Sequence, residues 1–458
     1  MKRLIAPILL FAGAFLSTCL IQRYTFIWQE SDGLFLTTGD YFSKMFSGSF
    51  NVAGYLGDFL SQFFRYSFYA PFIVGAGVAL SFLMLRGILR KFMVEADLPA
   101  ALLSCALWLA IAFAEGPTHG TAIVLCIFVL WLATRLLPKP RKGLRLPFWL
   151  DLALCAACAA GCFIFLACNA KLKGRETVAE VRYHVSVSDW NAALAAATPD
   201  AVAANPGILA PALLALGETG QLGDRLFSYD VRSEDDFDMV DQDDSYESLF
   251  FRSFLYSTLG CPSEAVHNLS QLATLQPHGT SFLVLRQLIL ENFRSGDYGL
   301  VEKYCTVLER STLNKSYVKY FRDQMRSGTP HARDSVEFRK EVRLITHDPF
   351  YNLYLLEGRS ANPGAVQDRI LCTLLLKGNI DGFREMLMSS SYASGPLPRH
   401  YQEALLMGGF EHEGITPAVR ERYMAFQSEI FTLPTAKVQE RYGGTYWLYL
   451  LSMPSGQP

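Results

Sequence analysis

The polar residues best arranged for chemistry follow the first apolar run of the 458-residue chain. Carboxylates, a guanidinium and an imidazole near one surface could act as base, anion-binding group and acid. The candidate residues of this membrane-surface site are Glu30, Asp32, Asp40, Asp58, Arg65 and His119. One hypothesis is therefore a membrane enzyme of envelope glycan or lipid chemistry. The plainer alternative is a packing helix with a solvated polar stripe, and a lone loop histidine is most often only solvated.

The segment 55–66 (YLGDFLSQFFRY) predicts the helix that would position this site. Aromatic residues recur every four positions at Tyr55, Phe59 and Phe63, whereas Asp58 falls on the opposite face. Because aromatic rings prefer the membrane–water boundary, we expect an amphipathic helix that lies in the outer interface. Membrane lipids are thus expected contacts of the chain.

A second polar group follows two prolines near residue 397. It consists of Arg399, His400 and Glu403, which share one turn of an expected helix. Charged residues at this spacing could form a polar site. They could equally dock the start of the helix, since proline favours the first helical turn.

An acidic stretch, residues 230–247, offers a weak calcium alternative. Its candidate ligands are Asp236, Asp238, Asp241, Asp243 and Glu247. An EF-hand loop needs glycine at position six and glutamate at position twelve. Counted from Asp236, Glu247 fits the twelfth position, but Asp241 replaces the glycine. A solvated loop is the simpler interpretation, so we expect no metal and no cofactor.

Five apolar segments precede residue 170 and predict a membrane domain, residues 1–169. They span residues 4–22, 70–85, 98–114, 121–137 and 147–168. About 20 apolar residues cross the hydrocarbon core, and a spanning segment must satisfy its own backbone, so we expect five transmembrane helices. A cleaved lipoprotein signal ending before Cys19 is an alternative interpretation of the first segment.

Lysine and arginine mark one side of this domain. They cluster before the first segment, between the second and third, and between the fourth and fifth. Positive loops face the cytoplasm, so we expect a cytoplasmic N-terminus and a multi-pass protein of the bacterial inner membrane. Five crossings would place residues 170–458 in the periplasm.

Residues 170–458 predict an all-α domain built of helical hairpins. One unit, from Tyr256 through Gly260 to Pro277, fits a tetratricopeptide-like pattern, and a second turns at Gly296, 36 residues after Gly260. Weaker copies turn at Gly220 and Gly378. The expectation is a TPR-like α-solenoid, and the alternative is a generic helical bundle.

Composition excludes several classes of protein. Charged residues make up 18% of the chain and the net charge is −2, so no basic field favours nucleic acid. The sequence contains no P-loop, zincin or nucleophile-elbow motif. Cys261, Cys305 and Cys372 are widely separated, and one disulfide among them is left open.

Six short segments, taken together, resemble a family of uncharacterised bacterial multi-pass membrane proteins, a domain of unknown function. They are LFLTTGDYF (34–42), YLGDFLSQFF (55–64), ALGETGQLGDRLF (215–227), LCTLLLKGNIDGF (371–383), PLPRHYQEALL (396–406) and RYGGTYW (441–447). The resemblance implies membrane helices followed by helical repeats. It implies no reaction, cofactor or catalytic residue.

The sequence therefore favours an interaction protein over an enzyme. We expect a membrane-anchored scaffold whose periplasmic solenoid binds a protein partner in envelope assembly, secretion or transport. The concave surface of a repeat array suits that task. The alternative is the membrane enzyme with acidic residues in its first outer loop.

Overall fold

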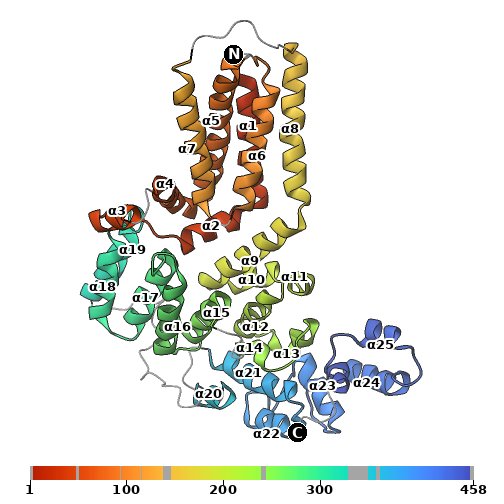
Figure 1. Ribbon diagram of the computed structural model, residues 1–458. Helices are drawn as coiled ribbons and strands as arrows, with labels where there is room; N and C mark the ends of the chain where they lie inside the picture. The colour runs from red at the N-terminus through yellow and green to blue at the C-terminus, as the bar shows by residue number, and fades with distance from the viewer. Residues whose placement is uncertain are drawn as a thin grey trace. The chain divides into compact units, whose positions relative to one another are not determined.

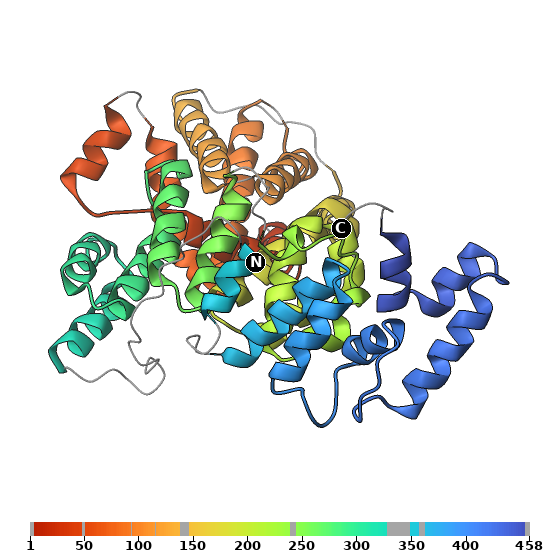
Figure 2. The same cartoon turned by 90° about the horizontal axis from the view of Figure 1, so that it is seen from below.

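The computed structural model describes residues 4–47, 51–92, 94–114, 116–137, 146–238, 244–327, 349–356 and 362–453. The regular elements in these ranges are helices (Figures 1 and 2), which confirms the all-α prediction. The chain divides into two compact units. Unit 1 comprises Met1–Tyr183, Ala273–Ile289 and Tyr298–Thr329. Unit 2 comprises His184–Leu272, Leu290–Asp297 and Pro330–Pro458.

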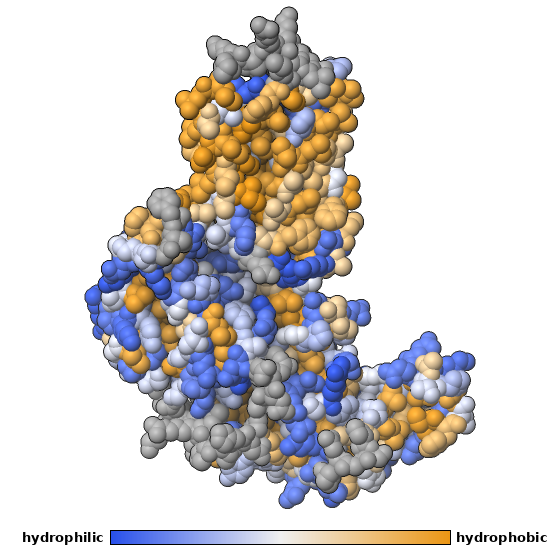
Figure 3. All heavy atoms as spheres, viewed as in Figure 1, coloured by the Kyte–Doolittle hydropathy of each residue, from blue (hydrophilic) through white to orange (hydrophobic). Residues whose placement is uncertain are grey.

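Five apolar helices of unit 1 form a bundle and alternate in direction (Figure 1). They are α1 (Ile5–Ile21), α5 (Tyr69–Lys91), α6 (Leu98–Phe113), α7 (Pro117–Thr134) and α8 (Phe148–Cys168), one for each predicted segment. The visible surface of the bundle is mostly hydrophobic (Figure 3).

Three of these helices, α5, α7 and α8, are long and apolar enough to cross a membrane. A fourth span results if α1 and α2 (Arg23–Asp32), which meet at an angle of 78°, count as one. Helix α6 has 16 residues, about 24 Å, and is shorter than the others. The described residues therefore support three to four membrane spans rather than the full set of five.

The bundle core lies between α1, α5, α6 and α8. Leu10, Val78 and Phe82 are fully buried there, and Trp108 fills the space beside Gly13. A Cβ atom added at Gly13 would lie 3.0 Å from the Trp108 ring, so α1 and α6 approach closely at this point. The Trp108 indole N–H donates to the Ser17 hydroxyl at 3.0 Å, which satisfies a polar group inside an apolar core.

The bend between α1 and α2 is stabilised by side chains from other helices. Gln22, at the bend, donates from its amide to the Ala112 carbonyl at 2.7 Å. Glu176 on α9 (Ala170–Ser186) accepts from the backbone N–H groups of Tyr24 and Thr25 at 2.7 and 2.9 Å. Burial raises the pKa of Glu176, although these hydrogen bonds favour its charged form. Glu176 thus caps the free N-terminus of α2 from outside the helix.

Replacing Glu176 by alanine is expected to destabilise unit 1 by about 1–2 kcal/mol, the upper part of the range for a lost N-cap. The first-turn N–H groups of α2 would lose their acceptor. The melting temperature of the purified protein in detergent measures the effect. Glu180→Ala, one turn further along α9, is the matched control, and an equal loss in both variants would contradict the capping role.

Charged side chains also satisfy both ends of α6. Asp151 accepts from the backbone N–H groups of Asp97 and Leu98 at 2.7 and 2.9 Å. At the other end, Arg175 donates to the carbonyls of Phe113 and Ala114 at 3.2 and 3.1 Å. The apolar helix α6 therefore has a charged side chain bound to its backbone at each end.

Short helices follow α2: α3 (Gly39–Phe46), α4 (Val52–Ser61) and the 3₁₀ turn η2 (Gln62–Arg65). The helix expected over 55–66 thus begins earlier and tightens after Ser61. The Gln62 side chain donates to the Phe59 carbonyl at 2.9 Å, which occupies a carbonyl near the end of the helix. Phe35 packs edge-on against Tyr55 and Phe59, so part of the aromatic face is covered by protein.

The remaining helices run from residue 190 to residue 452. They are α10 (Trp190–Ala196), α11 (Pro199–Ala204), η3 (Pro206–Ile208), α12 (Leu209–Glu218), α13 (Leu222–Arg225), η4 (Leu226–Ser228), α14 (Asp235–Asp238), α15 (Tyr246–Thr258), α16 (Pro262–Leu275), α17 (Phe282–Arg294), α18 (Tyr298–Leu308), α19 (Lys315–Ser327), α20 (Pro349–Leu356), α21 (Pro363–Leu376), α22 (Ile380–Ser389), α23 (Arg399–Met407), α24 (Pro417–Glu429), α25 (Thr435–Tyr442) and α26 (Tyr446–Ser452).

One turn geometry recurs between these helices. The expected turn glycines, Gly220, Gly260, Gly296 and Gly378, all have positive φ angles between 67° and 81°. The residue after each glycine donates its N–H to the carbonyl five positions earlier, as in the bond of 2.8 Å from Cys261 to Tyr256. This is the Schellman ending of a helix, in which glycine adopts the left-handed conformation without strain. The ten cysteines, including Cys261, Cys305 and Cys372, are free thiols.

Candidate functional site

Glu30 of the predicted membrane-surface site lies inside unit 1. It is 2% exposed and forms an ion pair with the Arg286 guanidinium on α17, 256 residues later in the chain. Arg286 also donates from Nε to the side-chain oxygen of Asn314 at 3.1 Å. Arg65 donates to the same oxygen at 3.1 Å. A buried carboxylate needs such a counter-charge, so Glu30 is held by its partner rather than presented to solvent.

Asp58 has a second set of partners in the same unit. Its Oδ2 atom lies 3.2 Å from Nε2 of His278 and 2.8 Å from the Tyr41 hydroxyl. The Tyr41 hydroxyl also lies 2.7 Å from the Leu34 carbonyl. Burial, reinforced by the Asp58 charge, raises the pKa of Tyr41, so its hydroxyl stays protonated and able to donate.

Backbone hydrogen bonds join the same parts of the chain. The Phe282 N–H donates to the Gly33 carbonyl at 2.9 Å, and the Thr37 N–H donates to the Arg310 carbonyl at 2.9 Å. The loop after α2 is therefore bonded to residues near both ends of the α17–α18 segment. We call Glu30, Asp58, Arg65, His278, Arg286 and Asn314 the docking cluster.

Three further predicted residues lie outside the docking cluster. Asp40 is exposed in the first turn of α3, and His119 is exposed in the first turn of α7. Asp32 is half-buried at the last position of α2. In the described ranges, neither Asp40 nor His119 has a hydrogen bond or ion pair with the cluster. The structure thus brings together half of the predicted site by adding Arg286 of α17 and two residues of connecting segments, His278 before α17 and Asn314 before α19.

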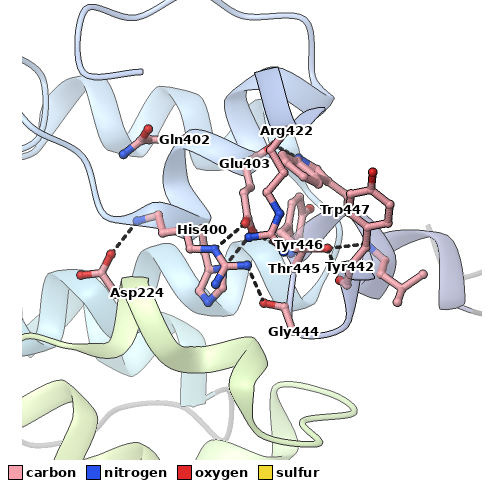
Figure 4. A network of polar contacts seen from close by, with 12 residues as sticks. Asp224, His400, Gln402, Glu403, Arg422, Tyr442, Gly444, Thr445, Tyr446 and Trp447 are labelled. Carbon is pink, nitrogen blue, oxygen red and sulfur yellow. Dashed lines mark hydrogen bonds and ion pairs between the residues drawn. The ribbon is translucent and has the colours of Figure 1, made fainter. Parts of the chain in front are cut away.

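The second predicted site is a buried network in unit 2 (Figure 4). The Glu403 carboxylate accepts from Nε of Arg399 at 2.8 Å and lies 2.9 Å from Nδ1 of His400. It also accepts the Tyr446 N–H at 2.8 Å, at the start of α26. Arg399 continues the network to the Gly444 carbonyl at 3.3 Å.

The His400–Glu403 pair at the centre of this network is closed to solvent, whereas Arg399 is partly exposed. His400 and Glu403 are 0% and 1% exposed, so neither side chain can meet a substrate in this conformation. Burial alone would raise the pKa of Glu403, but the hydrogen bond from His400 and the charges of His400 and Arg399 lower it below the ordinary value. The arrangement can dock α26 onto α23, and it keeps Glu403 ionised.

Lowering the pH is expected to weaken this contact. Because the folded-state pKa of Glu403 is lowered, its contribution to stability is present above the ordinary glutamate pKa of about 4.3 and is lost as the pH falls through the folded-state value. Melting temperatures of the wild type and Glu403→Gln between pH 3 and pH 6 measure this, using about 0.5-unit steps. The difference between the two proteins should shrink below about pH 4.3, and a constant difference would contradict the assignment.

Part of the calcium alternative falls outside the described residues, namely Asp241 and Asp243. Asp236 accepts the Arg232 N–H at 2.8 Å, and Glu247 lies in the first turn of α15. No group of three or more metal-ligating side chains occurs in the parts of the chain that the structure describes.

A family model matches residues 1–172 and 171–452, which is nearly the whole chain. The chain belongs to the family of unknown function DUF6057. No curated protein and no solved structure matches it. For this DUF6057 protein, function must therefore be argued from its own residues.

A groove of about 1310 Å3 lies beside the network of unit 2. Phe227 and Tyr449 form part of its wall, and Arg399 is the member of the predicted polar site that reaches it. Charges of both signs line it, including Asp230, Arg232, Glu234 and Lys377. The carboxylate of Glu234 and the ammonium of Lys377 are 3.6 Å apart.

Sequence patterns missed the partners that complete the docking cluster. His278 follows Pro277 at the end of a predicted repeat, and Arg286 lies on a predicted helix, but nothing local connects either residue to the first loop. The available signal was Glu30 itself, because an acid beside Phe26, Ile27 and Trp28 must find a counter-charge when that segment is buried.

Proposed function

We propose that this DUF6057 protein is a membrane-anchored scaffold whose extracytoplasmic helical region binds a protein partner in envelope assembly, secretion or transport. The observation that carries the proposal is that Glu30, Asp58 and Arg65 bind other parts of the same chain. Glu30 forms an ion pair with Arg286 of α17, and Asp58 contacts His278 in the turn before α17. Arg65, although exposed, donates to Asn314 just before α19. Acidic residues committed to such contacts favour an architectural role over catalysis.

The proposed membrane arrangement has five spans, with α6 included and the N-terminus in the cytoplasm. Arg86, Arg90 and Lys91 lie in the last turns of α5, and Arg135 directly follows α7. These ends of α5 and α7 lie at the end of the bundle where α1 begins (Figure 1), which agrees with a cytoplasmic positive side. Asp151 and Arg175, which bind the two ends of α6, support its inclusion as a span. A spanning helix must satisfy its terminal backbone groups near the interfaces. Residues after α8 would then face the periplasm.

The proposed partner-binding region is a TPR-like solenoid that includes the groove of unit 2. Repeated Schellman turns support the repeat character, and a fifth such turn occurs at Gly409, where the Phe410 N–H donates to the Leu405 carbonyl at 2.9 Å. The groove offers charged groups at its rim and aromatic rings in its wall, a combination that suits a protein segment.

Charge reversal at the groove tests the proposal. Asp230 and Arg232 line it and their side chains are 85% and 84% exposed, so Asp230→Lys with Arg232→Glu should leave the fold intact. Tagged protein is purified in mild detergent from its own cells, and co-purifying proteins are quantified by mass spectrometry. We expect a near-stoichiometric partner that the double variant loses by about tenfold or more, the effect of 1.4 kcal/mol.

Arg326→Glu is the matched control, because this side chain is 79% exposed and is not among the residues that line the groove. Retention of the partner by the double variant would overturn the groove as the binding surface. Purification of the chain alone with a bound lipid-linked sugar would favour the enzyme of envelope glycan or lipid chemistry.

A further inference from the structure

The membrane bundle contains a second cavity, which is apolar and lies between α5 and α7. Its volume is about 330 Å3. Gly77 on α5 leaves open space here, and Gly120 on α7 also lines the cavity. Ile111 of α6, which packs against Gly120, forms part of the inner wall. On the outer side, Phe72 and Leu80 line the cavity and are 48% and 56% exposed.

The two helices that form this cavity indicate what surrounds it. Helices α5 and α7 both meet the length and hydropathy requirements of a membrane span. Only 28% and 11% of their most apolar windows are buried within the protein. Exposed apolar surface on a spanning helix is surface in contact with lipid, so hydrocarbon chains are the medium at the mouth of the cavity.

The cavity is closed at one end by elements that follow the first span. Phe26 of α2 and Phe64 of η2 meet there edge to face, with ring centroids 5.2 Å apart, and both rings are buried. Gln29 of α2 also lines this part of the cavity. Its side-chain oxygen is buried and lacks a hydrogen-bond partner in the described part of the chain. A buried amide oxygen without a partner is unfavourable, and a hydrogen-bond donor on a ligand can satisfy it.

We propose that this cavity is a binding site for one acyl chain of a membrane lipid, with a hydroxyl or ammonium group of that lipid's headgroup donating a hydrogen bond to the Gln29 side-chain oxygen. The inference rests on the proposed membrane placement of α5 and α7, and it is independent of the protein partner. From Phe72 to Leu80 the cavity follows α5 for about 12 Å, so it takes part of one chain rather than a whole lipid.

Packing and the Gln29 hydrogen bond, rather than the hydrophobic effect, would hold the chain. A lipid tail is already in hydrocarbon, so moving it from the bilayer into the cavity removes little apolar surface from water. A chain that fills the cavity gains dispersion contacts that an empty cavity lacks. The bound lipid would also connect α2 and η2 to α5 and α7.

Gly77 provides a direct test. A Cβ atom added there meets no other atom within 4 Å, so Gly77→Leu can fill the cavity without a clash at its first carbon. Gly161 on α8 is the matched control, because it too has open space around an added Cβ and does not line the cavity. Both substitutions place the same side chain on a membrane helix.

The full chain is reconstituted in nanodiscs that contain phosphatidylglycerol with a photoactivatable diazirine at the middle of one acyl chain. Cross-linked residues are mapped by mass spectrometry. We expect labelling concentrated on the facing residues of α5 and α7, reduced about fivefold in Gly77→Leu, a loss near 1 kcal/mol, and unchanged in Gly161→Leu. Unlabelled phosphatidylglycerol should compete in a saturable manner.

Uniform labelling of all exposed bundle helices, unaffected by Gly77→Leu, would overturn the proposed binding site. The labelled lipid would then be the ordinary lipid that surrounds the bundle. If Gly77→Leu does not fold, the competition experiment and Gln29→Leu decide, because a site predicts saturation and reduced labelling whereas bulk lipid predicts simple dilution. Labelling of α5, α7 and α8 of any kind reports membrane insertion, so failure of the site is distinguishable from failure of the membrane placement.

Discussion

Replacing Arg286 by alanine is expected to release the segment α17–α19 from α2 and the loop that follows it. The substitution leaves the Glu30 carboxylate, 2% exposed, without its counter-charge. Breaking a buried ion pair by removing one partner costs about 3–5 kcal/mol. Asn314 also loses the donor at 3.1 Å that holds its side-chain oxygen. Hydrogen exchange of the purified protein should become faster at the Phe282 and Thr37 amides and along α19.

The helices of the bundle serve as the internal reference for this experiment. Their backbone bonds do not depend on Arg286, so their exchange should match that of the wild type. Arg326→Ala, on the exposed side of α19, is the control substitution and should change nothing. Unchanged exchange in Arg286→Ala would show that the ion pair does not hold this segment in solution.

Removing the Glu403 carboxylate is expected to detach α26 from α23 in unit 2. Glu403→Ala eliminates the acceptor for Arg399 and for the Tyr446 N–H, and leaves His400, fully buried, without its partner at 2.9 Å. The expected loss is about 3–5 kcal/mol, because two buried groups, the His400 ring and the Tyr446 N–H, lose their acceptor and each such loss costs about 1–3 kcal/mol. Faster hydrogen exchange over residues 445–452, together with a lower melting temperature, would report this change.

Glu411→Ala provides the comparison for Glu403. Glu411 also pairs with an arginine, Arg420, but both side chains are exposed, so solvent replaces the lost contact. We expect no measurable change in melting temperature. Equal effects at the two positions would mean that burial does not determine the strength of the Glu403 network.

The positions of the apolar bundle helices were predictable because their signal is local. Each apolar segment contrasts with the polar residues that flank it. The helices begin and end within a few residues of most predicted bounds. The exception is α5, which extends to Lys91, beyond the expected end at residue 85. Gly260 and Gly296 were predictable for the same reason, since a left-handed turn after an apolar helical stretch favours glycine. The bend at Gln22 was not, because it depends on Glu176, some 150 residues away.

The candidate site was only half predictable. Polar residues of the first loop stood out by type, and Glu30, Asp58 and Arg65 do meet the same partner segment. Their partners could not be predicted from the sequence. The residues that flank Arg286 and Asn314 are typical of any helix or loop and do not mark either residue as a partner of the first loop. Glu30 and Arg286 are 256 residues apart, and tertiary packing brings them together. Such a pair produces no characteristic spacing in the sequence.

Exchanging the two charges of the docking cluster tests the central claim most directly. The protein carrying both Glu30→Arg and Arg286→Glu is compared with each single variant by hydrogen exchange over α17–α19. We predict fast exchange in both single variants and recovery of most of the wild-type protection in the double variant, because an ion pair works in either direction. Double-variant exchange as fast as in the single variants, or single variants indistinguishable from wild type, would contradict the docking role of Glu30 and Arg286.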